Sequence, residues 1–240
     1  MRRLIVAAFL LLTIAAPCVA PADGQALRGY EAKQGYHYVA LGEYPQDEDG
    51  TVRPILWRVL SVEDGEAYLL SEYVLTNGRV HPDDKEYVAF DYAFNKTEVF
   101  ARLNGEFKEA AFSQEELSRL REDEELGVVF LAASADLKNP AMGFRDDKSR
   151  QGFGTPYALA NGLFRYGMSG RHSSPYWTRT PSINNETSGA VRCTKVKGNI
   201  GYIRCVVENE GIRPAIRLIL GDEPFAGGQG TLSEPFYYGR

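Results

Sequence analysis

An alternating apolar run in the first third of the chain constrains the fold most strongly. Ile55, Trp57 and Val59 recur at every second position, which is the period of a β-strand with one buried face. A second β-rich run, residues 67–71, follows the Asp64-Gly65 pair, and an Asp-Gly pair favours a two-residue hairpin turn. The sequence therefore predicts an antiparallel hairpin that places Trp57 in the main core.

Short helices are predicted after this hairpin. Asn95 and Ser113 are each followed three residues later by a glutamate, which is the spacing of a capping box at a helix start. The Asn104-Gly105 pair is expected to end the first helix, because glycine commonly follows a helix C-terminus. A third helix is expected at Thr155-Pro156, an N-cap residue followed by proline at the first helical position.

The remaining β-rich runs set the fold class. Residues 128–131 form a continuous apolar run, which predicts a central strand buried on both faces. Four further strands are predicted toward the end of the chain, at residues 176–180, 190–196, 200–207 and 212–220. The sequence thus predicts an α+β fold, mostly antiparallel sheet with two or three short helices and long loops.

Composition does not divide the chain, so residues 36–220 are expected to form a single domain. A Gly-rich C-terminal tail, residues 221–240, follows this domain. Its aromatic end, Phe236-Tyr237-Tyr238, is able to pack back onto the body.

The first 22 residues have the pattern of a secretory signal peptide. A basic start, Met1-Arg2-Arg3, precedes a short apolar run over residues 4–16 and then small residues, with cleavage expected after Ala22. The run is shorter than the roughly 20 residues that a transmembrane helix needs, so no transmembrane segment is predicted. Cys18 offers a lipoprotein alternative, but Pro17 stands where a small unbranched residue is expected. We therefore predict a secreted or periplasmic protein.

Two cysteines remain after cleavage, Cys193 and Cys205. Gly198-Asn199 is a turn signal, and a three-residue loop of Gly198, Asn199 and Ile200 would place the cysteines directly opposite each other, which predicts a cross-strand disulfide. Such a bond persists outside the cytoplasm and contributes about 3 kcal/mol in the chain-entropy model. The alternative is a redox or metal-binding thiol pair, although the spacing departs from Cys-x-x-Cys chemistry.

Charge and composition exclude several functions. A net charge of −5 and a pI near 5.4 argue against a general binder of nucleic acid or anionic membranes. The three histidines, His37, His81 and His172, are too dispersed for a local metal motif, and no catalytic set or cofactor motif is apparent. The aromatic content of 12%, including 14 tyrosines, suits either a core with polar rims or a sugar-facing surface.

Arg179 and Arg213 are the most informative charged residues, because each lies within two residues of a proline on a predicted strand. In a structural role, each guanidinium would be buried against a carboxylate or backbone carbonyls and would join neighbouring strands. In a ligand-binding role, they would form an anion or sugar clamp beside Tyr176 and Trp177. The structural role is favoured, because a buried charge that loses its partner is costly.

Three of these blocks together resemble a family of uncharacterised bacterial extracytoplasmic domains. They read PILWRVL at residues 54–60, WTRTP at residues 177–181 and GIRPA at residues 211–215. Arg102 stands where that family usually has tryptophan, and Thr178 and Thr180 replace leucine and serine. More distantly, the layout is similar to the C-type lectin-like fold of formylglycine-generating enzymes and their non-catalytic relatives.

The resemblance implies a C-type lectin-like single domain that acts as a non-catalytic binding or surface-interaction module. Glycan or cell-wall material is the ligand class that this fold and the aromatic content favour. The alternative is an oxidoreductase or hydrolase of the same fold, with Cys193 and Cys205 as a redox or copper site. A third possibility is an envelope assembly component that binds other proteins.

Overall fold

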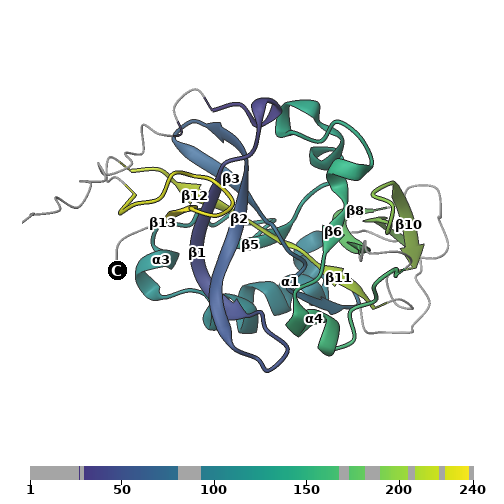
Figure 1. Ribbon diagram of the computed structural model, residues 1–240. Coiled ribbons are helices and arrows are strands. Elements are labelled where there is room, and N and C mark those ends of the chain that lie inside the picture. Colours follow the sequence, from purple (N-terminus) through teal and green to yellow (C-terminus); the bar gives the residue numbers. More distant parts are fainter. Residues whose placement is uncertain are drawn as a thin grey trace, which may run out of the picture.

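The computed structural model describes residues 27, 30–80, 93–167, 173–181, 190–204, 209–221 and 225–237 (Figure 1). The strands are β1 (Tyr38–Pro45), β2 (Val52–Glu63), β3 (Glu66–Ser71), β4 (Thr76–Gly78), β5 (Val129–Leu131), β6 (Gly152–Phe153), β7 (Ser173–Ser174), β8 (Tyr176–Pro181), β9 (Ala190–Thr194), β10 (Ile200–Arg204), β11 (Glu210–Ile212), β12 (Pro214–Ile219) and β13 (Phe236–Tyr237). The α-helices are α1 (Glu98–Arg102), α2 (Lys108–Ala111), α3 (Gln114–Leu117) and α4 (Pro156–Ala160). Short 3₁₀ turns lie at Ala32–Gln34, Phe94–Lys96, Asp136–Lys138, Pro140–Met142 and Lys148–Arg150.

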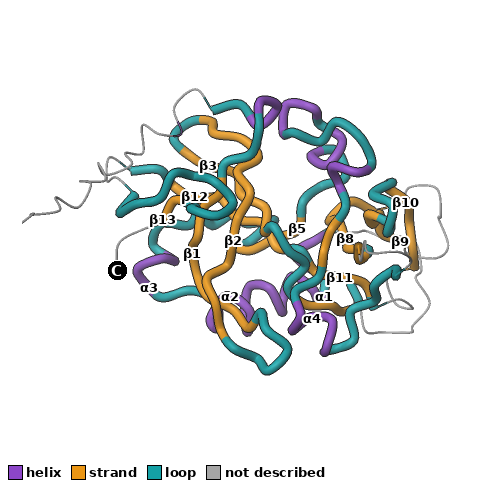
Figure 2. The backbone as a smooth tube through the Cα atoms, viewed as in Figure 1, coloured by secondary structure: helices purple, strands orange, loops and turns teal. Residues whose placement is uncertain are grey.

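The strands form two main sheets, as predicted for an α+β fold. One sheet has the order β13-β1-β2-β3-β12-β5 and the other has the order β10-β9-β8-β11-β4, while β6 and β7 form a separate ladder. Figure 2 shows the first sheet on the left and β8, β9 and β10 on the right, with short helices below. The pairings are antiparallel apart from β1 with β13 and β8 with β11. Among the described residues, no helix is long and apolar enough to cross a membrane.

The predicted hairpin is confirmed. β2 and β3 pair antiparallel around Asp64 and Gly65, whose φ angles of 51° and 77° are those of a two-residue type I′ turn. Ile55, Trp57 and Val59 have no exposed surface, so one face of β2 is buried as the alternation predicts.

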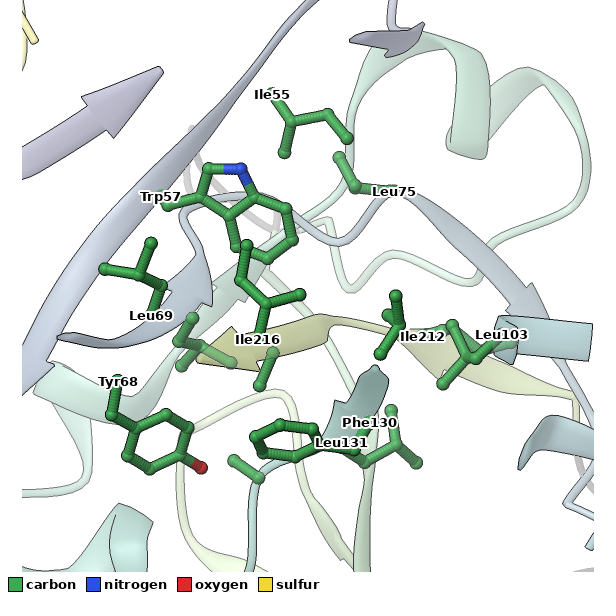
Figure 3. Packing of buried hydrophobic residues seen from close by; sticks show 14 of the residues in the cluster. Ile55, Trp57, Tyr68, Leu69, Leu75, Leu103, Phe130, Leu131, Ile212 and Ile216 are labelled. Atoms are coloured by element: carbon green, nitrogen blue, oxygen red, sulfur yellow. The ribbon is translucent and has the colours of Figure 1, made fainter. Parts of the chain in front are cut away.

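Trp57 packs in the centre of the main core. Figure 3 shows its indole beside Ile216 of β12, with Leu69 of β3 nearby. The indole Nε1 donates a hydrogen bond of 2.8 Å to the carbonyl of Leu41, and the ring stacks on Phe112 with centroids 6.2 Å apart. The one polar atom of this side chain therefore has a partner, which allows full burial.

A bulge in β1 gives Trp57 its partner. The pairing of β1 with β2 shifts register between Ala40 and Glu43, and Gly42 lies within the shift with a φ of +67°. A Cβ at Gly42 would lie 2.6 Å from the Phe112 ring, so only glycine fits both the backbone conformation and the packing. The Gly42 N–H donates to the Glu116 carboxylate at 2.9 Å.

Glu116 also confirms one predicted helix start. Ser113 caps α3, and the Glu116 side chain accepts from the Ser113 N–H at 2.8 Å, which completes a capping box. The other predicted box is wrong: Thr97, not Asn95, caps α1 and accepts from the Phe100 N–H. Asn95 lies in the 3₁₀ turn Phe94–Lys96, which comes directly before the Thr97 cap, so α1 begins later than predicted.

The prediction that Asn104-Gly105 ends the first helix is wrong. The chain continues through a π-type segment, Leu103–Phe107, and a kink at Gly105 into α2. The Asn104 side chain accepts from the Val128 N–H and the Val129 N–H and donates to the Val129 carbonyl at 2.9 Å. Asn104 thus bonds the edge of β5 rather than ending a helix.

β5 is buried as predicted, but it is not a central strand. Val129, Phe130 and Leu131 are at most 2% exposed, yet the strand lies at the edge of its sheet beside β12. Side chains occupy its other edge: Asn104 bonds Val129, and Arg179 Nη1 donates to the Leu131 carbonyl at 2.7 Å. A continuous apolar run indicates that a strand is buried, but it does not show whether the strand is central or lies at a sheet edge that other side chains cover.

The predicted closing strand, residues 212–220, is divided between the two sheets. β11 belongs to the five-stranded sheet and β12 to the six-stranded sheet, and Arg213 is the residue between them. Pro214 is the first residue of the inner strand β12. Proline is tolerated at the first residue of a strand, where its missing N–H removes no essential ladder bond.

The C-terminal segment packs on the body, confirming that its aromatic end folds back. β13 pairs with β1, with Val39 opposite Phe236. The Phe236 ring stacks on Phe225 with centroids 5.0 Å apart and is 4% exposed. Tyr238 lies outside the described residues.

Replacing Trp57 with alanine should lower the free energy of unfolding by about 3–5 kcal/mol, because the change leaves a large core cavity. Denaturant unfolding of the two proteins measures this difference. A loss below about 1 kcal/mol would contradict the central packing of the indole.

Candidate functional site

Arg213 joins the two sheets at the point where the chain passes from one to the other. Its side chain is 1% exposed. Nε donates 2.7 Å to the carbonyl of Ser71 at the end of β3, and Nη1 lies 3.3 Å from the Tyr176 hydroxyl on β8. The guanidinium also lies over the Tyr176 ring, 5.2 Å from its centroid. One side chain therefore bonds both sheets, as the structural role for Arg213 requires.

The two aromatic residues of the predicted site are buried beside this junction. Tyr176 and Trp177 are each 1% exposed. The Tyr176 hydroxyl donates 2.7 Å to the carbonyl of Arg150, and Trp177 Nε1 donates 2.7 Å to the carbonyl of Gly78. Their polar atoms are bonded to the backbone, so these rings are part of the core and present no face to solvent.

Arg179 lies in a different cluster. Its Nη1 is 3.3 Å from the Asp136 carboxylate and its guanidinium lies over the Phe130 ring. Asp136 also accepts from the Tyr68 hydroxyl at 2.8 Å. Burial, with the charge of Asp136, holds the pKa of Tyr68 well above its usual range, so the phenol stays a proton donor. The structure thus divides the four predicted residues between two clusters: Tyr176, Trp177 and Arg213 are buried, whereas the Arg179 side chain remains 21% exposed. The partners of both arginines are carbonyls, a carboxylate or a phenol of the protein, which favours their structural role.

The register of the cysteine hairpin differs from the prediction. Cys193 is buried on β9 and pairs with Gly201 of β10, so it is not opposite Cys205. The turn has the expected three-residue length but lies earlier in the chain: the Lys195 N–H donates to the Asn199 carbonyl at 2.9 Å, and Gly198 has a φ of +89°. Gly198 is the last residue of this loop and not the first, so the turn is centred two residues earlier than predicted and the partner of Cys193 shifts by four residues, from Cys205 to Gly201. Cys205 lies outside the described residues, so the disulfide stays a prediction.

Four exposed aromatic residues lie elsewhere, on segments around the β6–β7 ladder, while a further one, Tyr237, lies on β13. Tyr73, Phe153, Phe164 and Tyr166 are 36%, 39%, 57% and 45% exposed, and we call them the aromatic surface. Rings of this size are usually buried, so their exposure on neighbouring segments makes this region a candidate interaction surface.

Backbone hydrogen bonds place the segments of the aromatic surface side by side. The Val74 N–H, next to Tyr73, donates 2.9 Å to the Phe153 carbonyl, and Phe153 pairs with Ser173. Ser173 in turn accepts from the Tyr166 N–H at 3.0 Å. These bonds fix three of the four aromatic positions on neighbouring segments of one framework.

Phe164 completes the aromatic surface next to a buried anchor. Leu163 is 4% exposed, and its N–H donates 2.9 Å to the Ala158 carbonyl at the end of α4. Thr155 caps this helix and Pro156 begins it, as predicted. Sequence reasoning missed the aromatic surface, because a sequence pattern does not show which aromatic side chains in loops are exposed or which loops lie side by side.

A groove of about 970 Å³ lies between β1 and the helices α2 and α3. Small apolar residues and Phe112 make most of its floor, and its Glu116 carboxylate already bonds Gly42 and Ser113. Its lining also includes the charged residues Glu43, Glu115 and Arg119, so the groove combines apolar and polar groups and is a second candidate beside the aromatic surface. Within the described ranges, no three His, Cys, Asp or Glu side chains gather as metal ligands would.

Comparison with known proteins gives one finding. A family model described as a domain of unknown function (DUF6273) matches residues 123–220, which include β5 to β12 and the Arg213 junction. No curated protein and no solved structure matches the chain. The match is consistent with an uncharacterised domain family and assigns no activity.

Replacing Arg213 with lysine keeps the charge but removes the planar set of donors. We expect the free energy of unfolding to fall by about 1–3 kcal/mol, because a hydrogen bond to a charged group is lost in the core. Arg217→Lys is the matched control: this side chain is exposed on β12, and its replacement should change stability by less than about 0.5 kcal/mol. Equal melting of Arg213→Lys and the parent would show that the junction does not depend on the guanidinium.

The disulfide is tested by alkylating the mature protein after denaturation and measuring its intact mass. We expect no added mass without reductant and two added groups with it, because Cys193 and Cys205 are predicted to be bonded. Alkylation without reductant would instead support a thiol pair and the enzymatic alternative.

Proposed function

We propose that the chain is a secreted or periplasmic, non-catalytic binding module that binds glycan or cell-wall material through the aromatic surface. The observation that carries this proposal is the exposure of Tyr73, Phe153, Phe164 and Tyr166 on neighbouring backbone segments. The buried set around Tyr176 and Trp177 is not the binding surface in this proposal.

The chemistry of the aromatic surface supports a sugar ligand. The flat apolar face of a sugar ring packs on an exposed aromatic ring, while its hydroxyls need donors and acceptors around the edge. Tyr73 and Tyr166 supply phenol groups beside the two phenylalanines, and Arg165 is an exposed donor within the same segment. The net charge of −5 disfavours a polyanionic ligand such as nucleic acid.

The proposed location rests on the leader pattern of residues 1–22, which lie outside the described residues. We further propose a C-type lectin-like fold. Mixed sheets with short helices and long loops, and the return of the C-terminal β13 to β1 near the start of the domain, are in keeping with it.

Binding of the mature protein to purified, insoluble bacterial cell wall tests the proposal. We expect the double substitution Phe164→Ala and Tyr166→Ala to weaken binding at least tenfold, since exposed aromatic rings dominate the energy of such contacts. Leu232→Ala is the matched control, because Leu232 is 53% exposed but lies in the C-terminal segment away from the β6–β7 ladder. Its binding should equal that of the parent.

Melting temperatures of the three proteins should agree within a few degrees, because all the replaced side chains are exposed. Equal binding by the double variant and the parent would contradict a role for the aromatic surface. Absence of binding by the parent to cell wall, with binding to a purified envelope protein, would favour the envelope assembly alternative.

A further inference from the structure

Arg213 has donors that its structural role does not use. Its Nη2 is buried, and no partner for it lies among the described residues, whereas Nε and Nη1 bond Ser71 and Tyr176. No carboxylate of the described residues forms an ion pair with this guanidinium, although its side chain is only 1% exposed. A buried, unpaired positive charge costs several kcal/mol, so this position favours an anion.

The nearest acidic residue along β3 is already committed to another arginine. Glu72, which follows Ser71, forms a two-pronged ion pair with Arg58, with N–O distances of 2.8 and 2.7 Å. Both side chains of that pair are mostly buried. The charge of Arg58 is therefore balanced by Glu72, and the charge of Arg213 remains unbalanced within this region.

Two further unpartnered hydroxyls lie close to the same aromatic ring. Ser174 Oγ and Thr194 Oγ1 are buried without a hydrogen-bond partner among the described residues. Thr194 is the cross-strand partner of Tyr176, and Ser174 pairs with Gly152, whose backbone packs against the Tyr176 ring: a Cβ at Gly152 would lie 2.7 Å from Cδ1 of that ring. The Tyr176 hydroxyl is the group that Arg213 Nη1 contacts.

Most of the unpartnered buried side-chain atoms of the described residues therefore collect around Tyr176. The four are Arg213 Nη2, Ser174 Oγ, Thr194 Oγ1 and His37 Nδ1, and only His37 lies elsewhere, where its ring stacks on Phe236. A guanidinium edge with two hydroxyls is the donor set that binds the oxygens of a carboxylate or phosphate.

We propose that Arg213, Ser174 and Thr194 form an internal site for a small oxyanion, with Nη2 as the charged donor and the two hydroxyls as neutral donors. A carboxylate is the favoured ligand, because one of its oxygens can accept from Nη2 while the other accepts from the hydroxyls. The site is independent of the aromatic surface, so either proposal can fail without the other. Its occupation links anion binding to stability, because the same guanidinium joins the two sheets.

Separate titrations of the mature protein with sodium acetate, sodium phosphate and sodium chloride, at matched ionic strength and pH 7, test the site. Binding to the folded state alone should raise the melting temperature in a saturable way, by about 2–4 °C when it increases the folding constant about fivefold. A rise with acetate alone identifies a carboxylate site, and a rise with both acetate and phosphate identifies a general oxyanion site. An equal rise with chloride, or no saturable rise, would overturn the proposal.

Arg213→Met removes the donors and should abolish the saturable rise, whereas Arg217→Met, on an exposed position of β12, should retain it. Where Arg213→Met does not fold, the double substitution Ser174→Ala and Thr194→Val keeps the guanidinium and serves instead. This variant should bind acetate about tenfold more weakly, through the loss of two neutral donors. Unchanged acetate affinity in the double variant would remove these hydroxyls from the site and overturn the proposal.

Discussion

The chain leaves one sheet and enters the other at Arg213, and the guanidinium of this residue holds the two sheets together at that point. β11 ends in the five-stranded sheet, β12 begins in the six-stranded sheet, and Arg213 between them bonds Ser71 on one side and Tyr176 on the other. Hydrophobic burial alone would not fix the angle between the sheets, because it has no direction. Directional bonds from one planar group to two sheets supply that constraint. The packing of Tyr176 and the position of β8 then follow from it.

This constraint also determines where ligand binding is possible. Three of the residues that the sequence suggests as a clamp, Tyr176, Trp177 and Arg213, are buried. Arg213 and Tyr176 join the two sheets, and Trp177 bonds Gly78 within its own sheet. Aromatic rings that face solvent come instead from the loops around β6 and α4, which the framework positions through backbone bonds. A rigid interior of polar bonds and a set of exposed rings on its loops is a common arrangement for binding proteins.

Features that depend on neighbours in the sequence were predictable, and features that depend on distant contacts were not. The Asp64-Gly65 turn, the buried face around Trp57 and the Ser113 cap each arise within a few residues, so local chemistry decides them. Asn104 was misread because its function is to bond β5, more than 20 residues away. The exposed rings at Phe153 and Phe164 required knowledge of which loops lie side by side.

The most direct test of this account is a double-mutant cycle between Arg213 and Tyr176, measured by equilibrium unfolding. The variants are Arg213→Lys, Tyr176→Phe and the combination. If the guanidinium and the phenol together join the sheets, the two single substitutions should together lower the free energy of unfolding by more than the double substitution does. The difference is the interaction energy, about 0.5–3 kcal/mol for residues in direct contact. Additive losses within about 0.3 kcal/mol would show that the two groups act independently, and the junction would not be the constraint on which the fold depends.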